Sequence, residues 1–194
     1  MKIRILYFLV VCVFVSCSDY TPKPRGYSRI DKETYEMIEF KETEFSFLYP
    51  SNAKIEYLKS EKESEVWFNI IYPSYQATIY CTYIPSGKLS VSQMLEHSYK
   101  LAYGHAVKAE SISQSQFSDS LGHPIGLIYD IKGAVASPIQ FYVTDNSSNF
   151  MRGSLYFDSQ VNPDSISPVI SYLRNDIVNM IESFRWKHPN TAGR

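Results

Sequence analysis

Apolar and polar residues alternate with a period of two along several short runs of the chain. Successive side chains of an extended strand point to opposite faces of a sheet, so this alternation predicts strands with one buried face. Gly, Pro, Asn and Ser lie between several of the runs, where they favour turns. The predicted strands are residues 45–50, 53–58, 66–73, 76–85, 124–133, 137–145 and 149–158.

Two further segments have the period of a helix. The first begins at Ser90, with Gln93 three residues later as in a capping box, and ends near Tyr103. The second begins at Pro163 or Pro168, since proline suits a first helical turn. Its apolar residues recur every three or four positions and predict a helix that packs on the core: Ile166, Val169, Ile170, Leu173, Ile177, Met180, Ile181 and Phe184.

The order of these elements predicts the fold class. Four strands, a helix, three or four strands and a final helix contain no alternation of strand and helix of the kind that builds parallel sheets. We therefore expect an α+β fold: a mainly antiparallel sheet of about six to seven strands packed with two amphipathic helices that cover its apolar face. Residues 44–187 are long enough to form this as a single domain.

The N-terminal residues have a different pattern. The apolar run Ile5–Val15 follows Lys2 and Arg4, and it is too short to cross the roughly 30 Å hydrocarbon core of a bilayer as a helix. A basic segment, an apolar segment and a junction of small residues predict a signal peptide over residues 1–16. The junction resembles a bacterial lipobox, so we expect Cys17 to carry acyl chains such as palmitate. The alternative is an ordinary signal peptide that happens to contain a cysteine.

Residues 17–43 are predicted to be an extended tether between the lipid and the domain. Pro22 and Pro24 favour polyproline conformation, in which ten residues reach about 30 Å. Two roles stay open for the tether, because it either holds the domain away from the membrane or itself contacts a partner. Residues 188–194 are predicted to be a flexible tail.

Composition excludes several classes of function. The chain carries a formal charge of −1, and it becomes −3 when Lys2 and Arg4 leave with the signal peptide, so no basic surplus predicts nucleic-acid binding. An apolar content of 44% with 15% aromatic residues predicts a packed domain. Cys81 is left without a disulfide partner and lies in phase with the apolar face of its strand, so we expect it to be buried.

No motif in the sequence predicts catalysis or metal binding. The chain has no HExxH, GxSxG, Walker, Rossmann or CxxC pattern. His97 and His105 are eight residues apart, and on a helix this spacing would place them about two turns apart and out of reach of one metal ion. We expect that the protein is not an enzyme and has no cofactor or metal.

The outward face of the predicted sheet is the candidate binding surface. It is rich in Tyr, Thr and Gln, and Tyr and Arg are over-represented among the residues that dominate protein interfaces. The alternative is a solvated sheet face with ordinary cross-strand pairs. The residues predicted to form a docking face are Tyr80, Tyr142, Arg152 and Tyr156.

Five collinear blocks resemble the gliding-motility lipoprotein GldD family of the Bacteroidota. Together they extend over nearly all of the mature chain, with Val135 as a mild departure from the family's pattern. The blocks are PKPRGYSRID (22–31), WFNIIYPSYQATIY (67–80), KLAYGHAVKAESI (100–112), KGAVASPIQFYVTD (132–145) and NFMRGSLYF (149–157).

The resemblance implies an envelope lipoprotein needed for gliding and for the associated type IX secretion machinery, with other envelope proteins of that machinery as partners. It carries over no catalytic residue. A second, fold-level resemblance is to PsbP/Mog1-like domains, which also begin with an F-x-F-x-YP strand and end in an amphipathic helix. It supports the predicted architecture only, because fold does not determine function.

The bacterial context implied by the resemblance adds two expectations. Lipoproteins exported to the surface in this phylum tend to have several acidic residues after the lipidated cysteine, whereas only Asp19 occurs here, so we expect a periplasm-facing protein. The tripeptides that begin at Asp119 and Asp164 are similar to the phylum's O-glycosylation motif, which makes Ser120 and Ser165 candidate acceptors.

Three functional hypotheses follow. The first is a non-enzymatic, membrane-anchored component of the motility and secretion machinery that acts through protein contacts. The second is a periplasmic lipoprotein that binds a small ligand or glycan on the Tyr-rich face. The third is a hydrolase whose site is assembled from residues far apart in the sequence, and it would require a pocket with perturbed ionisable groups.

Overall fold

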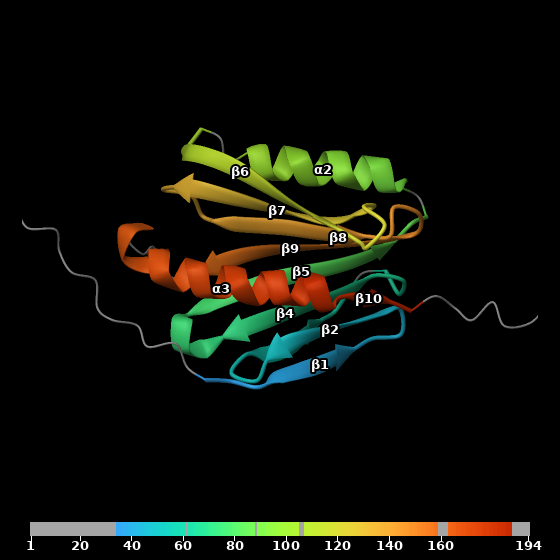
Figure 1. Ribbon diagram of the computed structural model, residues 1–194, viewed down its shortest axis with the longest axis horizontal. Helices are drawn as coiled ribbons and strands as arrows, with labels where there is room; N and C mark the ends of the chain where they lie inside the picture. The colour runs from blue at the N-terminus through green and yellow to red at the C-terminus, as the bar shows by residue number, and fades with distance from the viewer. Residues whose placement is uncertain (1–33, 61, 88, 105–106, 159–162, 188–194) are drawn as a thin grey trace, which may run out of the picture.

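The computed structural model describes residues 34–60, 62–87, 89–104, 107–158 and 163–187 (Figure 1). The predicted signal peptide, the lipidation site Cys17, His105 and the predicted tail lie outside these residues. Neither of the helices in the described ranges combines the length and the hydropathy needed to cross a bilayer.

The strands form two antiparallel sheets. The larger sheet has seven strands in the order β3-β4-β5-β9-β8-β7-β6, and the smaller has three in the order β1-β2-β10. The strands of the larger sheet are β3 (Lys54–Leu58), β4 (Val66–Tyr72), β5 (Ala77–Pro85), β6 (Ala109–Ser118), β7 (Pro124–Gly133), β8 (Ile139–Thr144) and β9 (Asn149–Phe157). Those of the smaller are β1 (Met37–Lys41), β2 (Phe45–Pro50) and β10 (Arg185–Trp186), and the short 3₁₀ turn η1 (Pro73–Tyr75) joins β4 to β5.

The two α-helices are α2 (Val91–Tyr103) and α3 (Pro163–Ser183). The predicted capping box is confirmed, because the Ser90 hydroxyl accepts from the Gln93 backbone and the Gln93 side chain accepts from the Ser90 backbone. The predicted end near Tyr103 is also confirmed. The α+β class, the mainly antiparallel sheet and the two amphipathic helices are therefore as expected.

One expectation about the helices is wrong, since α2 and α3 lie on opposite faces of the large sheet. Phe150 and Met151 are neighbours in β9, so their side chains point to opposite faces. Phe150 packs with Val91 of α2, whereas Met151 belongs to the core under α3. The face opposite α3 also carries apolar rings near β8, and α2 covers them.

Three strands have no clear signal in the sequence. The ten residues of β6 are mostly polar and exposed, yet they pair with β7 along its length. The strand β1 lies within the residues predicted to be tether, and it pairs with β2, so the folded part of the chain includes residues before 44. The two-residue strand β10 pairs with the other side of β2.

Aromatic residues fill the core between the two sheets and α3. Phe45 stacks with Phe47 and Phe184 at centroid separations of 6.2 and 5.4 Å, and Phe68 of β4 lies 5.9 Å from Phe47. All four are buried. Because β2 and α3 share this cluster, the small sheet packs beside α3 on the same face of the large sheet, as Figure 1 shows.

Candidate functional site

The predicted docking residues lie on three adjacent strands at the middle of the large sheet. β9 is the central strand, and Arg152 pairs with Thr82 of β5 on one side and Tyr142 of β8 on the other. Two residues further along β9, Ser154 pairs with Tyr80. The two-residue period of a strand therefore brings the predicted side chains onto one face, opposite α3.

Helix α2 covers one part of this face and leaves the other part open. Tyr142 stacks on Phe150 with ring centroids 5.6 Å apart and packs against the cluster of Val91 and Met94 of α2. Its hydroxyl pKa is raised by this burial. Tyr142 thus belongs to the packing under the helix, whereas the other three predicted residues remain accessible at the open part of the face.

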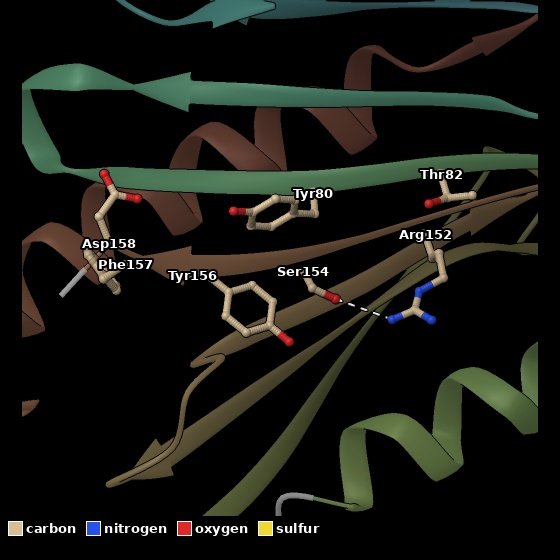
Figure 2. A pocket seen from close by; sticks show the side chains of 7 residues that line it. All are labelled: Tyr80, Thr82, Arg152, Ser154, Tyr156, Phe157 and Asp158. Carbon is tan, nitrogen blue, oxygen red and sulfur yellow. Dashed lines mark hydrogen bonds between the residues drawn. The ribbon is translucent and has the colours of Figure 1, made fainter. Parts of the chain in front are cut away.

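The open part forms a recess with a volume of about 700 Å³ (Figure 2). Tyr80 and Tyr156 are 47% and 36% exposed, and their rings meet edge to face with centroids 5.6 Å apart. Figure 2 shows this pair between Arg152 at one end of the recess and Asp158 at the other. The lining residues are Tyr80, Thr82, Arg152, Ser154, Tyr156, Phe157 and Asp158.

Arg152 has an unusual charge environment. Its Nη2 donates a long hydrogen bond of 3.4 Å to the Ser154 hydroxyl, and it forms no ion pair with any carboxylate in the described part of the chain. Partial burial lowers the pKa of the guanidinium, and the nearby Tyr156 acts in the opposite direction. An arginine with so high an ordinary pKa stays charged, so the recess contains an uncompensated cation.

Arg174 differs from Arg152 because it has a carboxylate partner. Arg174 of α3 donates from Nε and Nη2 to the two carboxylate oxygens of Asp130, at 2.7 and 2.9 Å, and from Nη2 to Ser115 at 3.1 Å. This bidentate pair joins α3 to β7 and β6. Its geometry satisfies most of the guanidinium donors, as is usual for a structural arginine.

The recess has the chemistry of a binding site. Its lining includes one guanidinium, one carboxylate, the hydroxyls of two Tyr, one Thr and one Ser, and three aromatic residues. None of the lining residues is a histidine, lysine or cysteine that would serve as a base or nucleophile beside Ser154. Among the described residues, no three His, Cys, Asp or Glu side chains gather as a metal would require.

The predicted glycosylation sites differ in what the structure describes. Ser120 lies in the turn between β6 and β7 and is exposed. Asp119 closes this turn, because its Oδ1 accepts from the backbone of Leu121 and of His123, each at 2.9 Å. Ser165 lies in the first turn of α3, but its side chain is outside the described part. Modification at either residue stays a prediction.

Cys81 is buried in β5, in the core under α3. Desolvation raises the pKa of its thiol well above the ordinary value. A protonated thiol is a poor nucleophile, so Cys81 acts as a small apolar residue of the core. His97 is on the exposed side of α2.

A second polar cluster has no signal in the sequence. Asp176 is 4% exposed on the core side of α3, and its carboxylate accepts from the hydroxyl of Tyr35, a residue 141 positions earlier. Tyr72 of β4 lies beside Asp176, and burial, with the charge of Asp176 adding to it, raises the pKa of Tyr72 well above its ordinary value. The cluster ties the segment before β1 to the helix.

Comparisons with known proteins give a match to a family and similarity to several solved structures. The family model described as "Gliding motility lipoprotein GldD" matches residues 17–186. The solution structure of cyanobacterial PsbP from Synechocystis sp. PCC 6803 is similar at 13% identity with a TM-score of 0.48, over 85% of this chain and 100% of that chain. A similarity this low supports no argument about function. No curated protein matches the chain at a significant level.

Proposed function

The chain belongs to the GldD family of gliding-motility lipoproteins, and from this premise we propose that it is a non-enzymatic component of the gliding apparatus and its associated type IX secretion machinery. The observation that carries the proposal is the family match, which begins at Cys17 and continues almost to the end of the domain. A lipoprotein of this family is anchored in the cell envelope.

The proposed anchor is lipid on Cys17. Each buried methylene contributes about 0.8 kcal/mol to membrane binding, and two or more acyl chains make the anchor stable. In this proposal the domain faces the periplasm. In this arrangement the protein acts at a membrane surface and does not diffuse away from its partners.

The proposed mode of action is contact with other envelope proteins of the machinery. The accessible part of the outer sheet face supports it, because Tyr80 and Tyr156 expose large rings beside the charged Arg152. Tyr and Arg at the centre of an interface often supply most of its binding energy. The described surface offers these three residues together on the rigid central strands of the sheet.

Deletion and complementation of the gene in cells test this function directly. Deletion of the gene should abolish spreading on surfaces and reduce secreted cargo, and the wild-type gene should restore both. A Cys17→Ala variant should fail to restore them while the domain still accumulates. Normal spreading together with normal secretion in the deletion strain would contradict the proposal.

Site-specific cross-linking identifies the contact surface. A photoreactive residue at Tyr156 should capture a partner in intact cells, whereas the same residue at Glu39 should not. Glu39 is the matched control, since it is an exposed strand residue of the small sheet, away from the recess. Equal capture from both positions would remove the outer face as the docking surface.

A second function is supported by the recess itself. A volume of about 700 Å³ falls within the range of roughly 300–1,000 Å³ typical of small-ligand sites. Binding of a small ligand or glycan at Tyr80, Arg152 and Tyr156 is therefore the alternative to protein docking. A ligand that binds the folded state raises the melting temperature with its concentration, so a thermal-shift screen tests this function.

A further inference from the structure

Arg152 is the residue of the recess that most restricts what it can bind. Moving a charged group out of water is unfavourable unless opposite charge or hydrogen bonds compensate it. Arg152 is partly buried on the central strand, and its described contacts are limited to one 3.4 Å hydrogen bond with Ser154. Most of its five N–H donors are thus available to a ligand.

The nearest possible counter-charge of the recess is too far away to compensate Arg152. Asp158 lines the recess six residues further along the chain, just after β9, which corresponds to about 20 Å at 3.3 Å per residue. Figure 2 shows the two at opposite ends, with the tyrosine pair between them. An anion is therefore favoured at the Arg152 end alone.

The other lining residues favour a ligand that carries hydroxyl groups and a ring. Tyr80, Thr82, Ser154 and Tyr156 supply hydroxyls that donate as well as accept hydrogen bonds. The edge-to-face pair of Tyr80 and Tyr156 also presents exposed ring surface beside Arg152. A ligand that matches all three features carries an anionic group, several hydroxyls and a compact ring with apolar C–H faces.

The geometry points to an acidic sugar as the ligand, a hexuronic acid unit whose carboxylate binds Arg152 and whose ring lies against Tyr80 and Tyr156. This inference rests on the ligand-binding function proposed above and names the chemistry of its ligand. A single guanidinium balances the single charge of a carboxylate, and its planar fork suits bidentate contact. A phosphomonoester carries a charge of about −1.5 to −2 at pH 7, which is more than this one cation compensates.

An acidic peptide matches the recess less well. Its carboxylate would satisfy Arg152, but its backbone and methylene groups would leave the four hydroxyls of the lining poorly used. The hydroxyl-rich wall favours a polyhydroxylated ligand, because ligand hydroxyls replace the water bonds of the wall, whereas apolar groups would leave the wall hydroxyls unpaired, which is unfavourable. An acidic peptide is therefore a competing outcome of the experiment.

Equilibrium dialysis of the full chain in detergent micelles tests the inference with three probes: glucuronic acid, glucose and a short peptide rich in glutamate. Glucuronic acid should bind, and glucose should bind at least about tenfold more weakly because it lacks the charged hydrogen-bond acceptor. The Arg152→Gln variant should lose at least about tenfold of the affinity for glucuronic acid. Lys132→Gln removes one positive charge from an exposed position of β7 and should bind like wild type.

The tyrosine pair gives a second test that separates ring contact from hydrogen bonding. Tyr156→Phe keeps the ring and should retain most of the affinity for glucuronic acid, whereas Tyr156→Ala should lose it. Circular dichroism of each variant verifies that the domain is folded. An equal loss in Tyr156→Phe and Tyr156→Ala would overturn the assignment of ring stacking and with it the proposed pose.

The remaining outcomes separate this inference from the functions on which it rests. Equal binding of glucose and glucuronic acid, or full binding by Arg152→Gln, overturns the carboxylate assignment. Binding of the peptide without glucuronic acid overturns the acidic sugar and favours protein docking. If none of the probes binds, the acidic-sugar inference fails, while the thermal-shift screen still decides whether the recess binds another ligand.

Discussion

The hydroxyl of Tyr35 donates a hydrogen bond to Oδ1 of Asp176, which attaches the segment before β1 to the buried side of α3. Tyr72 of β4 lies beside the same carboxylate. A buried carboxylate is stable only when its hydrogen-bond capacity is used. The contact therefore fixes the point at which the chain enters the domain from its N-terminal side.

Replacement of Tyr35 by Phe should lower the free energy of unfolding by about 1–3 kcal/mol, because it leaves part of a buried carboxylate unsatisfied. Urea denaturation measures this change. Tyr57→Phe is the matched control, since Tyr57 makes the same type of bond to Glu42 in an exposed position. The control should cost less than about 1 kcal/mol, as exposed interactions do. Equal losses in the two variants would mean that the burial of Asp176 does not make its hydrogen bond more important for stability than an exposed one.

The sequence predicts the strands and helices where one face is apolar and the other polar. The stripe of the last helix is a clear case, and Leu173, Ile177 and Ile181 are fully buried as expected. The strand β6 escapes prediction because polar side chains predominate on both of its faces, and its pairing with β7 depends largely on backbone hydrogen bonds that any sequence can make.

The position of α2 and the cluster at Asp176 depend on tertiary contacts that no local pattern contains. Strand phase predicts that Tyr142 faces outward, but its ring and that of Phe150 form an apolar patch on which helix α2 packs. In the helical pattern Asp176 is only a polar residue within an apolar stripe, and no local pattern can reveal that its hydrogen-bond partner, Tyr35, lies 141 residues earlier. Likewise, strand phase predicts that Arg152 faces outward, but not that it has no carboxylate partner among the described residues.

Alkaline pH should destabilise the domain. Burial raises the pKa of Tyr83 to about 12, with the charges of Glu44 and Asp145 adding to the effect, and burial likewise raises the pKa of Tyr129 to about 12. Phenols of the unfolded chain lose their protons near pH 10. Between about pH 10 and 12 the unfolded state therefore binds fewer protons than the folded state, so the stability that is complete below pH 10 falls as pH rises.

Urea denaturation at about pH 8, 10 and 11 measures this decline. Tyr83→Phe should be less stable at pH 8, since it loses the 2.7 Å hydrogen bond from Tyr83 to Asn149, but its stability should fall less steeply above pH 10. A slope identical to that of wild type would show that Tyr83 does not contribute to the alkaline transition.

Gly153 in the middle of β9 should not tolerate a side chain. A Cβ at this position would lie 2.2 Å from Cζ of the Phe141 ring on β8. Gly153→Ala should therefore cost about 1–3 kcal/mol through overpacking. The double variant Gly153→Ala/Phe141→Leu should lose less stability than the sum of the losses of the two single variants, because the two sites are in contact.

Gly87→Ala serves as the control for Gly153→Ala, since the nearest atom to its added Cβ is the Pro85 carbonyl oxygen at 4.0 Å. Its stability should stay within about 0.5 kcal/mol of wild type. A loss at Gly153 no larger than at Gly87 would show that the Phe141 ring moves aside without strain.

Arg152 should be a residue whose removal stabilises the domain. Because this partly buried cation has no carboxylate partner in the described residues, Arg152→Met should raise the free energy of unfolding by about 0.5–2 kcal/mol while it abolishes anion binding. Arg174→Met is the matched comparison: it breaks the bidentate pair with Asp130 and should lower stability by about 1–3 kcal/mol. Urea denaturation of both variants measures the difference, and a loss of stability in Arg152→Met would mean that the residue serves the fold and not a ligand.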